Sequence, residues 1–379
     1  MPSLALENAL VDSGMREATD LVETAAPPLP GEAEVLLHES PEGALTWHRP
    51  GELGLVGARP GRVRRFVFAV VDRAVEAFET RARPHRLRAF PDDTDVDLAE
   101  LAAQGRVLLL VHGTASTAAS AFGALPGPLL ATLAERYGGR LVAFEHPTIS
   151  VAPVDNVAWL AEQLVGLGTG RLGVDLLAHS RGGLVSRLLA EQPDRTGGRL
   201  DVGRAVLVAS PNAGTALADD ERIGQLLDRL TTMADLLPDP LGRPVLDVVL
   251  RIVQQVAIGA LHGLDGLAAM DPDNKFLGDV LNTGSPDRSG YAAVAADFEP
   301  RPGSALAQVA LDGLSDLVFA EAANDLVVPT EGCYDVPGLD GFQVADRLVF
   351  AAHEGVDHNG YWTRPAFADH LVRWLDPRE

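Results

Sequence analysis

From residue 106 onward, short apolar runs alternate with amphipathic segments of helical period. Runs of this kind are typical of strands that are buried on both faces of a parallel sheet, and amphipathic segments are typical of helices that cover such a sheet. We interpret the following runs as strands: residues 106–111, 141–143, 172–177, 205–209, 291–298 and 348–352. The pattern predicts an α/β fold with a mostly parallel central sheet and helices on both faces.

A serine lies in a short turn between one predicted strand and the helix that follows it. The strand is residues 172–177, Ser180 comes three residues later, and an amphipathic segment follows directly. A nucleophile elbow has this pattern, and its cramped turn requires almost no side chain at the flanking positions, which hold Ala178 and Gly182. The backbone N–H of Arg181 would open the helix and face an oxyanion. Ser180 is therefore the candidate nucleophile.

The turn after the first predicted strand is the candidate oxyanion loop. Gly113 would let the chain turn so that the backbone N–H of Thr114 joins that of Arg181 in holding a negative oxygen. His112 precedes the serine in the chain, and we interpret it as a residue that orients this loop. His179, beside the serine, is expected to be a structural part of the elbow.

The candidate acid is Asp325, within the sequence Ala-Asn-Asp-Leu-Val-Val-Pro. A carboxylate followed by an apolar run and a proline suits a residue that holds a histidine from a fixed loop and stabilises its imidazolium form. Asp316 is the alternative. It lies at the start of an apolar run, which is the wrong end of a strand for this role, so Asp325 is favoured.

The candidate general base is His358. It follows the last predicted strand and precedes a final amphipathic helix at residues 366–375. The loop between these two elements is where a base that works with Ser180 belongs. His353, closer to the strand, is the alternative.

Together these segments resemble the lipase-like branch of the α/β-hydrolase superfamily, from about residue 106 to the end of the sequence. Residues 179–185 and 324–329 are also similar to a bacterial hydrolase group associated with CHAT-domain proteins, although no caspase-like module is recognisable. The resemblance implies an α/β-hydrolase fold. The sequence departs from the family pattern at Ala178, which replaces the usual glycine, and at Arg181, which is expected to narrow or charge the pocket mouth.

The function implied by this resemblance is that of a serine ester hydrolase of the lipase or carboxylesterase type. Ser180, His358 and Asp325 would form a triad that works through an acyl-enzyme intermediate. The expected substrate is a small-molecule ester with an apolar acyl group. Two alternatives stay open: an acyltransferase with the same triad, and a non-catalytic interaction or regulatory module on this fold.

Composition narrows the choice of partners and compartment. A formal net charge of −22 argues against nucleic-acid binding, because neutralising phosphates needs clustered positive charge. A single cysteine, Cys333, allows no intramolecular disulfide and fits a reducing compartment. No histidine or cysteine cluster has metal-ligand spacing, so we expect no metal and no cofactor. The first residues lack the basic and apolar regions of a signal peptide, and a cytoplasmic location is expected.

The region before residue 106 is expected to contribute smaller elements. Residues 1–30 would form a flexible polar arm that ends in prolines. Residues 31–105 would supply antiparallel edge strands at 34–38 and 43–47, and then a basic amphipathic helix at 62–88. The arginines of this helix would pair with the protein's own carboxylates or form a docking face for an acidic partner.

The remaining residues, 106–379, are expected to form the catalytic domain with a helical cap at about 216–289. This insertion carries apolar stripes at helical spacing and would supply an apolar pocket over the site. Residues 245–261 are apolar, but charged side chains interrupt them, so a transmembrane segment is not expected. A further surface helix is predicted at 303–314.

Overall fold

The computed structural model describes most of the chain from residue 83 onward and shorter parts before it. Residues are described over 11–26, 33–39, 41, 45–48, 54, 58–68, 79–81, 83–218, 264–284, 287, 290–299, 322–336 and 344–376. The contacts between residues divide the chain into two units. One comprises residues 1–82 and 220–265, and the other comprises residues 83–219 and 266–379.

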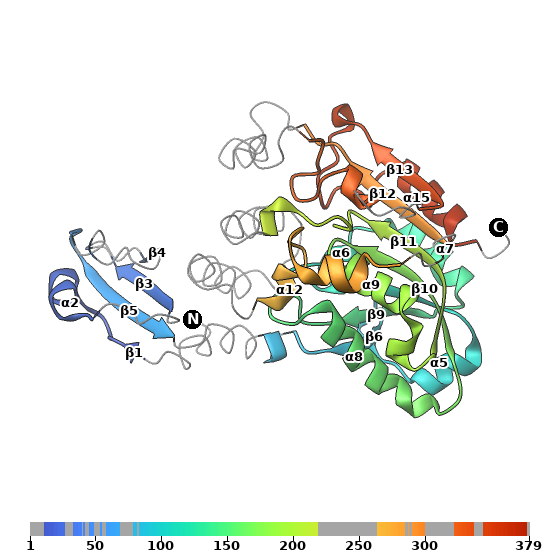
Figure 1. Cartoon of the computed structure of the whole chain (residues 1–379), viewed down its shortest axis with the longest axis horizontal. Helices are drawn as coiled ribbons and strands as arrows, with labels where there is room; N and C mark the ends of the chain where they lie inside the picture. The colour runs from blue at the N-terminus through green and yellow to red at the C-terminus, as the bar shows by residue number, and fades with distance from the viewer. Residues whose placement is uncertain are drawn as a thin grey trace. The chain divides into compact units, whose positions relative to one another are not determined.

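The larger unit is built on an eight-stranded sheet with the order β13-β12-β11-β10-β8-β9-β6-β7 (Figure 1). All pairs from β13 to β9 are parallel, whereas β6 runs antiparallel to both β9 and β7. The strands are β6 (Arg86–Ala89), β7 (Thr94–Asp95), β8 (Val107–Val111), β9 (Leu141–Glu145), β10 (Leu172–His179), β11 (Leu200–Val208), β12 (Tyr291–Ala296) and β13 (Asp346–Phe350). The predicted α/β-hydrolase fold is confirmed in this mostly parallel sheet.

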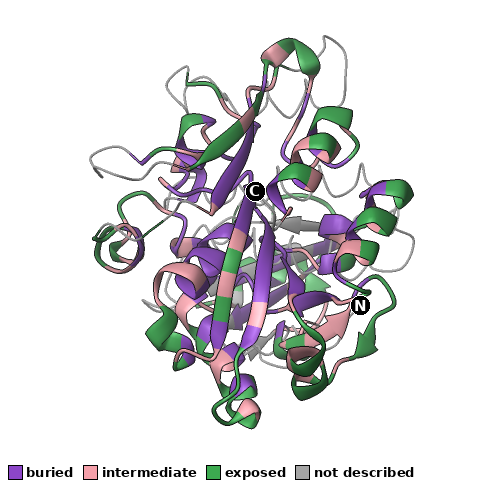
Figure 2. Cartoon of the chain, turned by 90° about the vertical axis from the view of Figure 1, so that its right-hand side faces the viewer, coloured by how far each residue is buried: buried purple, intermediate pink, exposed green. Residues whose placement is uncertain are grey.

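Helices cover both faces of this sheet because its central strands are apolar on both sides. All five residues of β8 are buried, and Figure 2 shows buried positions concentrated on the strands. One face packs against α6, α7 and α15, and the other face carries α5, α8 and α9. The helices are α5 (Leu98–Gln104), α6 (Ala118–Phe122), α7 (Gly127–Arg136), α8 (Pro153–Leu164), α9 (Gly182–Glu191), α12 (Asp265–Ala268) and α15 (Pro365–Trp374).

Shorter helical turns complete the unit. Most of them are 3₁₀ turns, and one is a π-helix, η4. They are η1 (Val165–Leu167), η2 (Pro193–Thr196), η3 (Ala216–Ala218), η4 (Phe276–Leu281), η5 (Glu331–Cys333) and η6 (Ala352–Glu354).

The strand order creates a switch point beside β8. The chain passes from β8 to β9 on one side, and then crosses so that β10 pairs with the other side of β8. The loops that leave β8 and β10 therefore diverge at adjacent carboxyl ends, which is where open α/β sheets bind their ligands. Thr114 and Ser180 follow these two strands.

The smaller unit contains a five-stranded antiparallel sheet with the order β1-β5-β3-β4, in which β2 also pairs with β5. Leu21, Leu36 and Val63 form a small buried cluster in it. Its elements are β1 (Val11–Asp12), β2 (Arg16–Glu17), α2 (Ala18–Thr24), β3 (Ala33–Glu39), β4 (Leu45–His48) and β5 (Arg62–Phe68). The two strands expected at 34–38 and 43–47 are therefore present, but they belong to this separate sheet.

Two expectations about the first hundred residues are wrong. Residues 11–26 are not a flexible arm, because β1 and β2 pair with β5 and Leu21 of α2 is buried. The expected helix at 62–88 begins instead as strand β5. All seven residues of β5 pair with β3, and the buried ion pair between Arg65 and Glu34 joins the two strands, so cross-strand pairing prevails over the helical pattern.

Other expectations fall partly or wholly outside the described residues. These are the middle of the basic helix at 69–78, most of the cap at 219–263 and the surface helix at 303–314. The cap therefore stays a prediction.

The start of α9 provides a test of the close packing in this fold. A β-carbon at Gly182 would overlap the carbonyl oxygen of Val111 and lie 2.6 Å from that of His112. We expect Gly182→Ala to lower the free energy of unfolding by about 1–3 kcal/mol, measured by urea denaturation. Gly127→Ala is the matched control, because no atom lies within 4 Å of the added carbon. Equal stability of the two variants would contradict the close contact between Gly182 and the carbonyl oxygens of Val111 and His112.

Candidate active site

Ser180 occupies a strained turn between β10 and α9. Its φ of +55° lies in the left-handed region, which costs a residue other than glycine about 1–2 kcal/mol. Three hydrogen bonds hold the turn: Ser180 N–H to Val208 O at 2.8 Å, Gly183 N–H to Ser180 O at 2.9 Å, and Ser210 Oγ to Ser180 O at 3.3 Å. The turn has the geometry that the sequence predicts for a nucleophile elbow.

Further strained residues follow other strands at this edge of the sheet. Positive φ values occur at Ala115, beyond β8, and at Ala209, directly after β11. Leu326 has a φ of +83°, which is an outlier for a bulky side chain. Strain of this kind persists only where the surroundings over-determine the backbone, and it tends to gather at functional sites.

The structure brings Ser180, His358 and Asp325 together. The Ser180 hydroxyl lies 3.0 Å from His358 Nε2, and His358 Nδ1 lies 2.8 Å from Asp325 Oδ2. All three residues are at most 3% exposed. A hydroxyl, an imidazole and a carboxylate in this order can pass a proton from the serine to the histidine while the carboxylate fixes the ring.

Asp325 is held by hydrogen bonds to both carboxylate oxygens. The N–H groups of Val327 and Val328 donate to Oδ1 at 3.1 and 2.8 Å, and the hydroxyl of Tyr361 donates to Oδ2 at 2.8 Å. Burial alone would raise the pKa of Asp325, but the charge of His358 and these hydrogen bonds outweigh burial and lower the pKa. The carboxylate therefore stays ionised although it is buried.

The loop that carries Asp325 is fastened to its neighbours through backbone carbonyl groups. Thr215 Oγ1 donates to Val327 O, and Thr330 Oγ1 donates to Ala296 O at the end of β12, both at 2.6 Å. The backbone N–H of His358 donates to the carbonyl of Asp325 at 3.0 Å. The loops of the acid and the base are therefore joined by their main chains as well as by their side chains.

His179 supports His358 from the elbow. Its Nε2 donates to the carbonyl oxygen of His358 at 2.8 Å, and the two rings lie 5.0 Å apart. Burial, followed by the nearby His358, lowers the pKa of His179 to about 3. His179 is therefore a neutral donor at physiological pH.

The candidate oxyanion loop lies against the serine. A β-carbon at Gly113 would approach Ser180 Cβ to 2.6 Å and Ser180 Oγ to 3.1 Å, so the close approach requires glycine. Thr114 comes next, and its backbone N–H donates to no other residue within the described part of the chain. The N–H of Arg181 lies at the start of α9, where the helix dipole favours negative charge.

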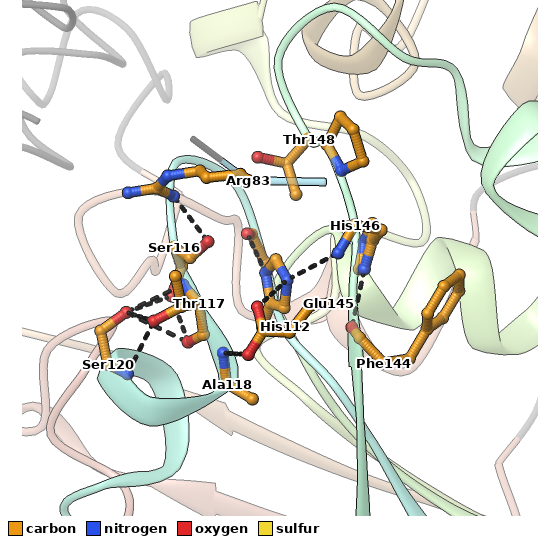
Figure 3. Close-up of polar contacts among 12 residues, drawn as sticks. Arg83, His112, Ser116, Thr117, Ala118, Ser120, Phe144, Glu145, His146 and Thr148 are labelled. Atoms are coloured by element: carbon orange, nitrogen blue, oxygen red, sulfur yellow. Dashed lines mark hydrogen bonds and ion pairs between the residues drawn. The ribbon is translucent and has the colours of Figure 1, made fainter. Parts of the chain in front are cut away.

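His112 supports the candidate oxyanion loop and lies beside Glu145 (Figure 3). Its Nδ1 lies 3.0 Å from Gly113 O, and its Nε2 lies 3.3 Å from Glu145 Oε2. Glu145 also accepts the N–H of Ala118 at 2.9 Å. Burial would raise the pKa of Glu145, but the hydrogen bond and charge of His112 outweigh it and lower the pKa.

The sequence analysis missed Glu145 and Tyr361. The only signal for Glu145 is a charged residue at the end of an apolar strand, and Tyr361 lies three residues after His358, on the same loop. The expectation for Arg181 is wrong. Its side chain is fully buried and donates to the carbonyl groups of Gly266 and Val151, so it does not line the mouth of a pocket.

The alternative base, His353, is exposed in η6 and does not join this arrangement. The alternative acid, Asp316, lies outside the described residues. Within the described ranges, no group of three or more histidine, cysteine, aspartate or glutamate side chains could hold a metal ion.

Residues 72–376 match the family described as "Domain of unknown function (DUF7379)". The chain belongs to this family. No curated protein matches the sequence.

Several solved structures are similar to this member of the family. Bacillus licheniformis lipase BlEst2 in mature form is 19% identical, with a TM-score of 0.43, over 70% of this chain and 91% of that chain. Lipase 1 from Pelosinus fermentans is 14% identical, with a TM-score of 0.48, over 72% and 99%. The enol-lactonase from Burkholderia xenovorans LB400 is 15% identical, with a TM-score of 0.34, over 77% and 95%. Because these identities and TM-scores are low, we base the fold assignment on the strand order of this chain and on its turn at Ser180.

In the part of this family member that the structure describes, no helix combines the length and the apolar character needed to cross a lipid bilayer. The apolar segment at 245–261 lies outside the described residues.

The low pKa of His179 predicts a loss of stability in acid. Between pH 6.5 and about 3 the unfolded chain binds a proton at this histidine and the folded chain does not. The free energy of unfolding therefore falls by about 1.4 kcal/mol per pH unit as the pH decreases through this window. We expect His179→Gln to lose about 2 kcal/mol less than the wild type between pH 7 and pH 5, measured by urea denaturation.

The exposed His353 gives the control for this experiment. His353→Gln should follow the wild-type pH dependence, since it leaves the buried His179 in place. The same pH dependence in His179→Gln and in the wild type would show that His179 is not buried in its neutral form.

Proposed function

We propose that this protein is a serine hydrolase that cleaves carboxylic esters. The observation that carries the proposal is the buried, hydrogen-bonded series from the Ser180 hydroxyl through His358 to Asp325. Of the functions that this fold can serve, acyl transfer to a serine is the one that such a series supports best.

In the proposed reaction His358 Nε2 takes the hydroxyl proton as Ser180 Oγ attacks the ester carbonyl. Asp325 stabilises the imidazolium that forms and keeps Nδ1 protonated. The imidazolium then protonates the leaving alkoxide, and an acyl-enzyme remains. Water deprotonated by the same histidine releases the carboxylic acid and restores the serine.

The negative oxygen of the tetrahedral intermediates would be held by the backbone N–H groups of Thr114 and Arg181. The close approach of Gly113 to Ser180 supports this role, because it brings the loop after β8 beside the nucleophile. Donors of this kind act strongly because they are fixed before the charge develops.

Two arguments support an ester substrate with an apolar acyl group. One is the resemblance of the sequence to lipase-like hydrolases. The other is the buried Met270, whose sulfur accepts a hydrogen bond from the Thr114 hydroxyl at 3.7 Å. A soft sulfur acceptor beside the reacting centre suits an acyl chain better than a charged substrate.

Labelling with a fluorophosphonate probe tests the nucleophile and its base. We expect the probe to modify Ser180, as shown by peptide mass mapping, and modification to collapse in His358→Ala. Ser180→Ala should keep the fold and lose hydrolysis of p-nitrophenyl butyrate by about 10⁴-fold or more. His353→Ala is the matched control for His358→Ala and should retain both labelling and turnover.

Two results would contradict the proposal. One is wild-type turnover in Ser180→Ala. The other is a folded wild-type protein that neither reacts with the probe nor hydrolyses any ester in a series of graded chain length, which would favour a non-catalytic module.

Replacing the acid tests the third member of the triad. Asp325→Asn would favour the wrong imidazole tautomer, because its amide can donate to Nδ1 as well as accept from it, and we expect kcat to fall about 10³- to 10⁴-fold. Asp316→Asn, at the alternative position, should leave kcat near the wild-type value. A large fall of kcat in Asp316→Asn, with kcat near the wild-type value in Asp325→Asn, would identify Asp316 as the acid instead.

A further inference from the structure

Tyr361 contacts the carboxylate oxygen that His358 also uses. Its hydroxyl donates to Asp325 Oδ2 at 2.8 Å, the same distance that separates His358 Nδ1 from this oxygen. The tyrosine is fully buried and follows His358 by three residues on the same loop. Its ring packs against Phe350 of β13, with ring centroids 6.1 Å apart. The phenol is therefore fixed independently of the histidine.

Each oxygen of Asp325 has two donors, and the two pairs of donors differ in kind. Oδ1 is held by the two backbone N–H groups of Val327 and Val328, which a side-chain substitution does not remove. Oδ2 receives the imidazole N–H and the phenol O–H. Without the phenol, the histidine would be the only donor to Oδ2 among these four groups. The position and the charge of this oxygen consequently depend on Tyr361.

The surroundings of Tyr361 keep it a donor. Burial, and then the nearby charge of Asp325, raise the pKa of the Tyr361 hydroxyl well above its ordinary value. A phenolate beside the ionised carboxylate would be strongly disfavoured, so the proton stays on the phenol oxygen throughout the working pH range.

We propose that Tyr361 is a positioning residue of the site, whose hydroxyl orients Asp325 Oδ2 toward His358 and takes up part of its negative charge. This inference rests on the proposed function of the Ser180 site, which it deepens. A donor that shares the charge of Oδ2 leaves less of that charge to stabilise the imidazolium. Removing the hydroxyl should therefore make protonation of His358 easier.

Besides Tyr361, three titratable groups face His358. Asp325 is ionised, and His179 from the end of β10 stays neutral because burial lowers its pKa. Asp357 precedes the base on its own loop, and burial raises the pKa of this carboxyl although the N–H of Asn359 donates to it. His179 and Asp357 have hydrogen-bond partners other than the Tyr361 hydroxyl, and Tyr361→Phe leaves those partners in place.

The chain offers a matched control in Tyr137 and Asp175. The Tyr137 hydroxyl donates to Asp175 Oδ2 at 2.8 Å, and both residues are buried. Tyr137→Phe therefore removes the same kind of hydrogen bond as Tyr361→Phe, from a carboxylate that does not contact the triad.

The experiment follows the imidazole of His358 by nuclear magnetic resonance in protein labelled with ¹⁵N-histidine, with the signal assigned through His358→Gln. We expect the titration midpoint of His358 to move to higher pH by about half to one unit in Tyr361→Phe, and to stay at its wild-type value in Tyr137→Phe. The acid limb of the pH profile of kcat/KM for an ester should move in the same direction.

A second variant changes the donor without removing it. Replacing the tyrosines with 3-fluorotyrosine makes the phenol a stronger donor, and the His358 midpoint should then move to lower pH. This shift should vanish when position 361 is phenylalanine. The protein that contains 3-fluorotyrosine keeps every tyrosine ring in place. It therefore tests the effect of the Tyr361 hydroxyl on His358 even if Tyr361→Phe does not fold.

An unchanged His358 midpoint in both Tyr361→Phe and the fluorinated protein would overturn the inference and leave Tyr361 as a packing residue. The resonance readout does not depend on turnover. A shifted midpoint in a protein that hydrolyses no ester would therefore refute the proposed function while supporting the contact.

Discussion

The backbone of Ser180 is the constraint around which the site is built. A φ of +55° presents the side chain at the end of β10, and the chain must then enter α9 at once. That entry brings α9 so close to the end of β8 that a side chain at Gly182 would overlap the carbonyl of Val111. The same approach puts Gly113 against the serine. Ser180 and the candidate oxyanion loop are thus positioned by one packing requirement.

The charge of each titratable group in the site depends on its hydrogen-bond partners. Asp325 remains charged because four donors replace the water it has lost, and Glu145 remains charged because His112 and Ala118 bind it. His179 gains one acceptor and no carboxylate in contact, so burial keeps it neutral. The two acids are therefore ionised and the histidine is neutral, with no unpaired charge among these three.

A residue of the site can be predicted from the sequence when its role follows from the residues next to it in the chain. The small residues around Ser180 and the glycine after His112 are required by local backbone geometry, so the turns at both places were predictable. The association of Asp325 with His358 followed from the chain order of the strands. Tyr361 and Glu145 act through contacts between loops, and no local pattern marks them.

The first hundred residues show the same limit in the fold. Apolar residues in the region of β5 recur at a spacing that suits a helix, yet Arg62–Phe68 pairs with β3 over its whole length. The partner strand lies more than twenty residues away in the chain, and the period of a single segment does not contain it. The buried ion pair between Glu34 and Arg65 also became visible only once the register of these strands was known.

The loop after β11 joins the strained serine to the acid loop. Ser210 bonds to the carbonyl of Ser180, whereas Asn212 and Thr215 bond to the carbonyls of Cys333 and Val327. None of these three side chains forms a hydrogen bond with the hydroxyl of Ser180, the imidazole of His358 or the carboxylate of Asp325, yet they connect the loops that carry Ser180 and Asp325. The acceptors are backbone carbonyl groups, so these hydrogen bonds do not depend on the side chains of Cys333 and Val327. Hydrogen bonds to main-chain carbonyl groups therefore link the loop of Ser180 to the loop of Asp325, and the imidazole of His358 lies between these two side chains.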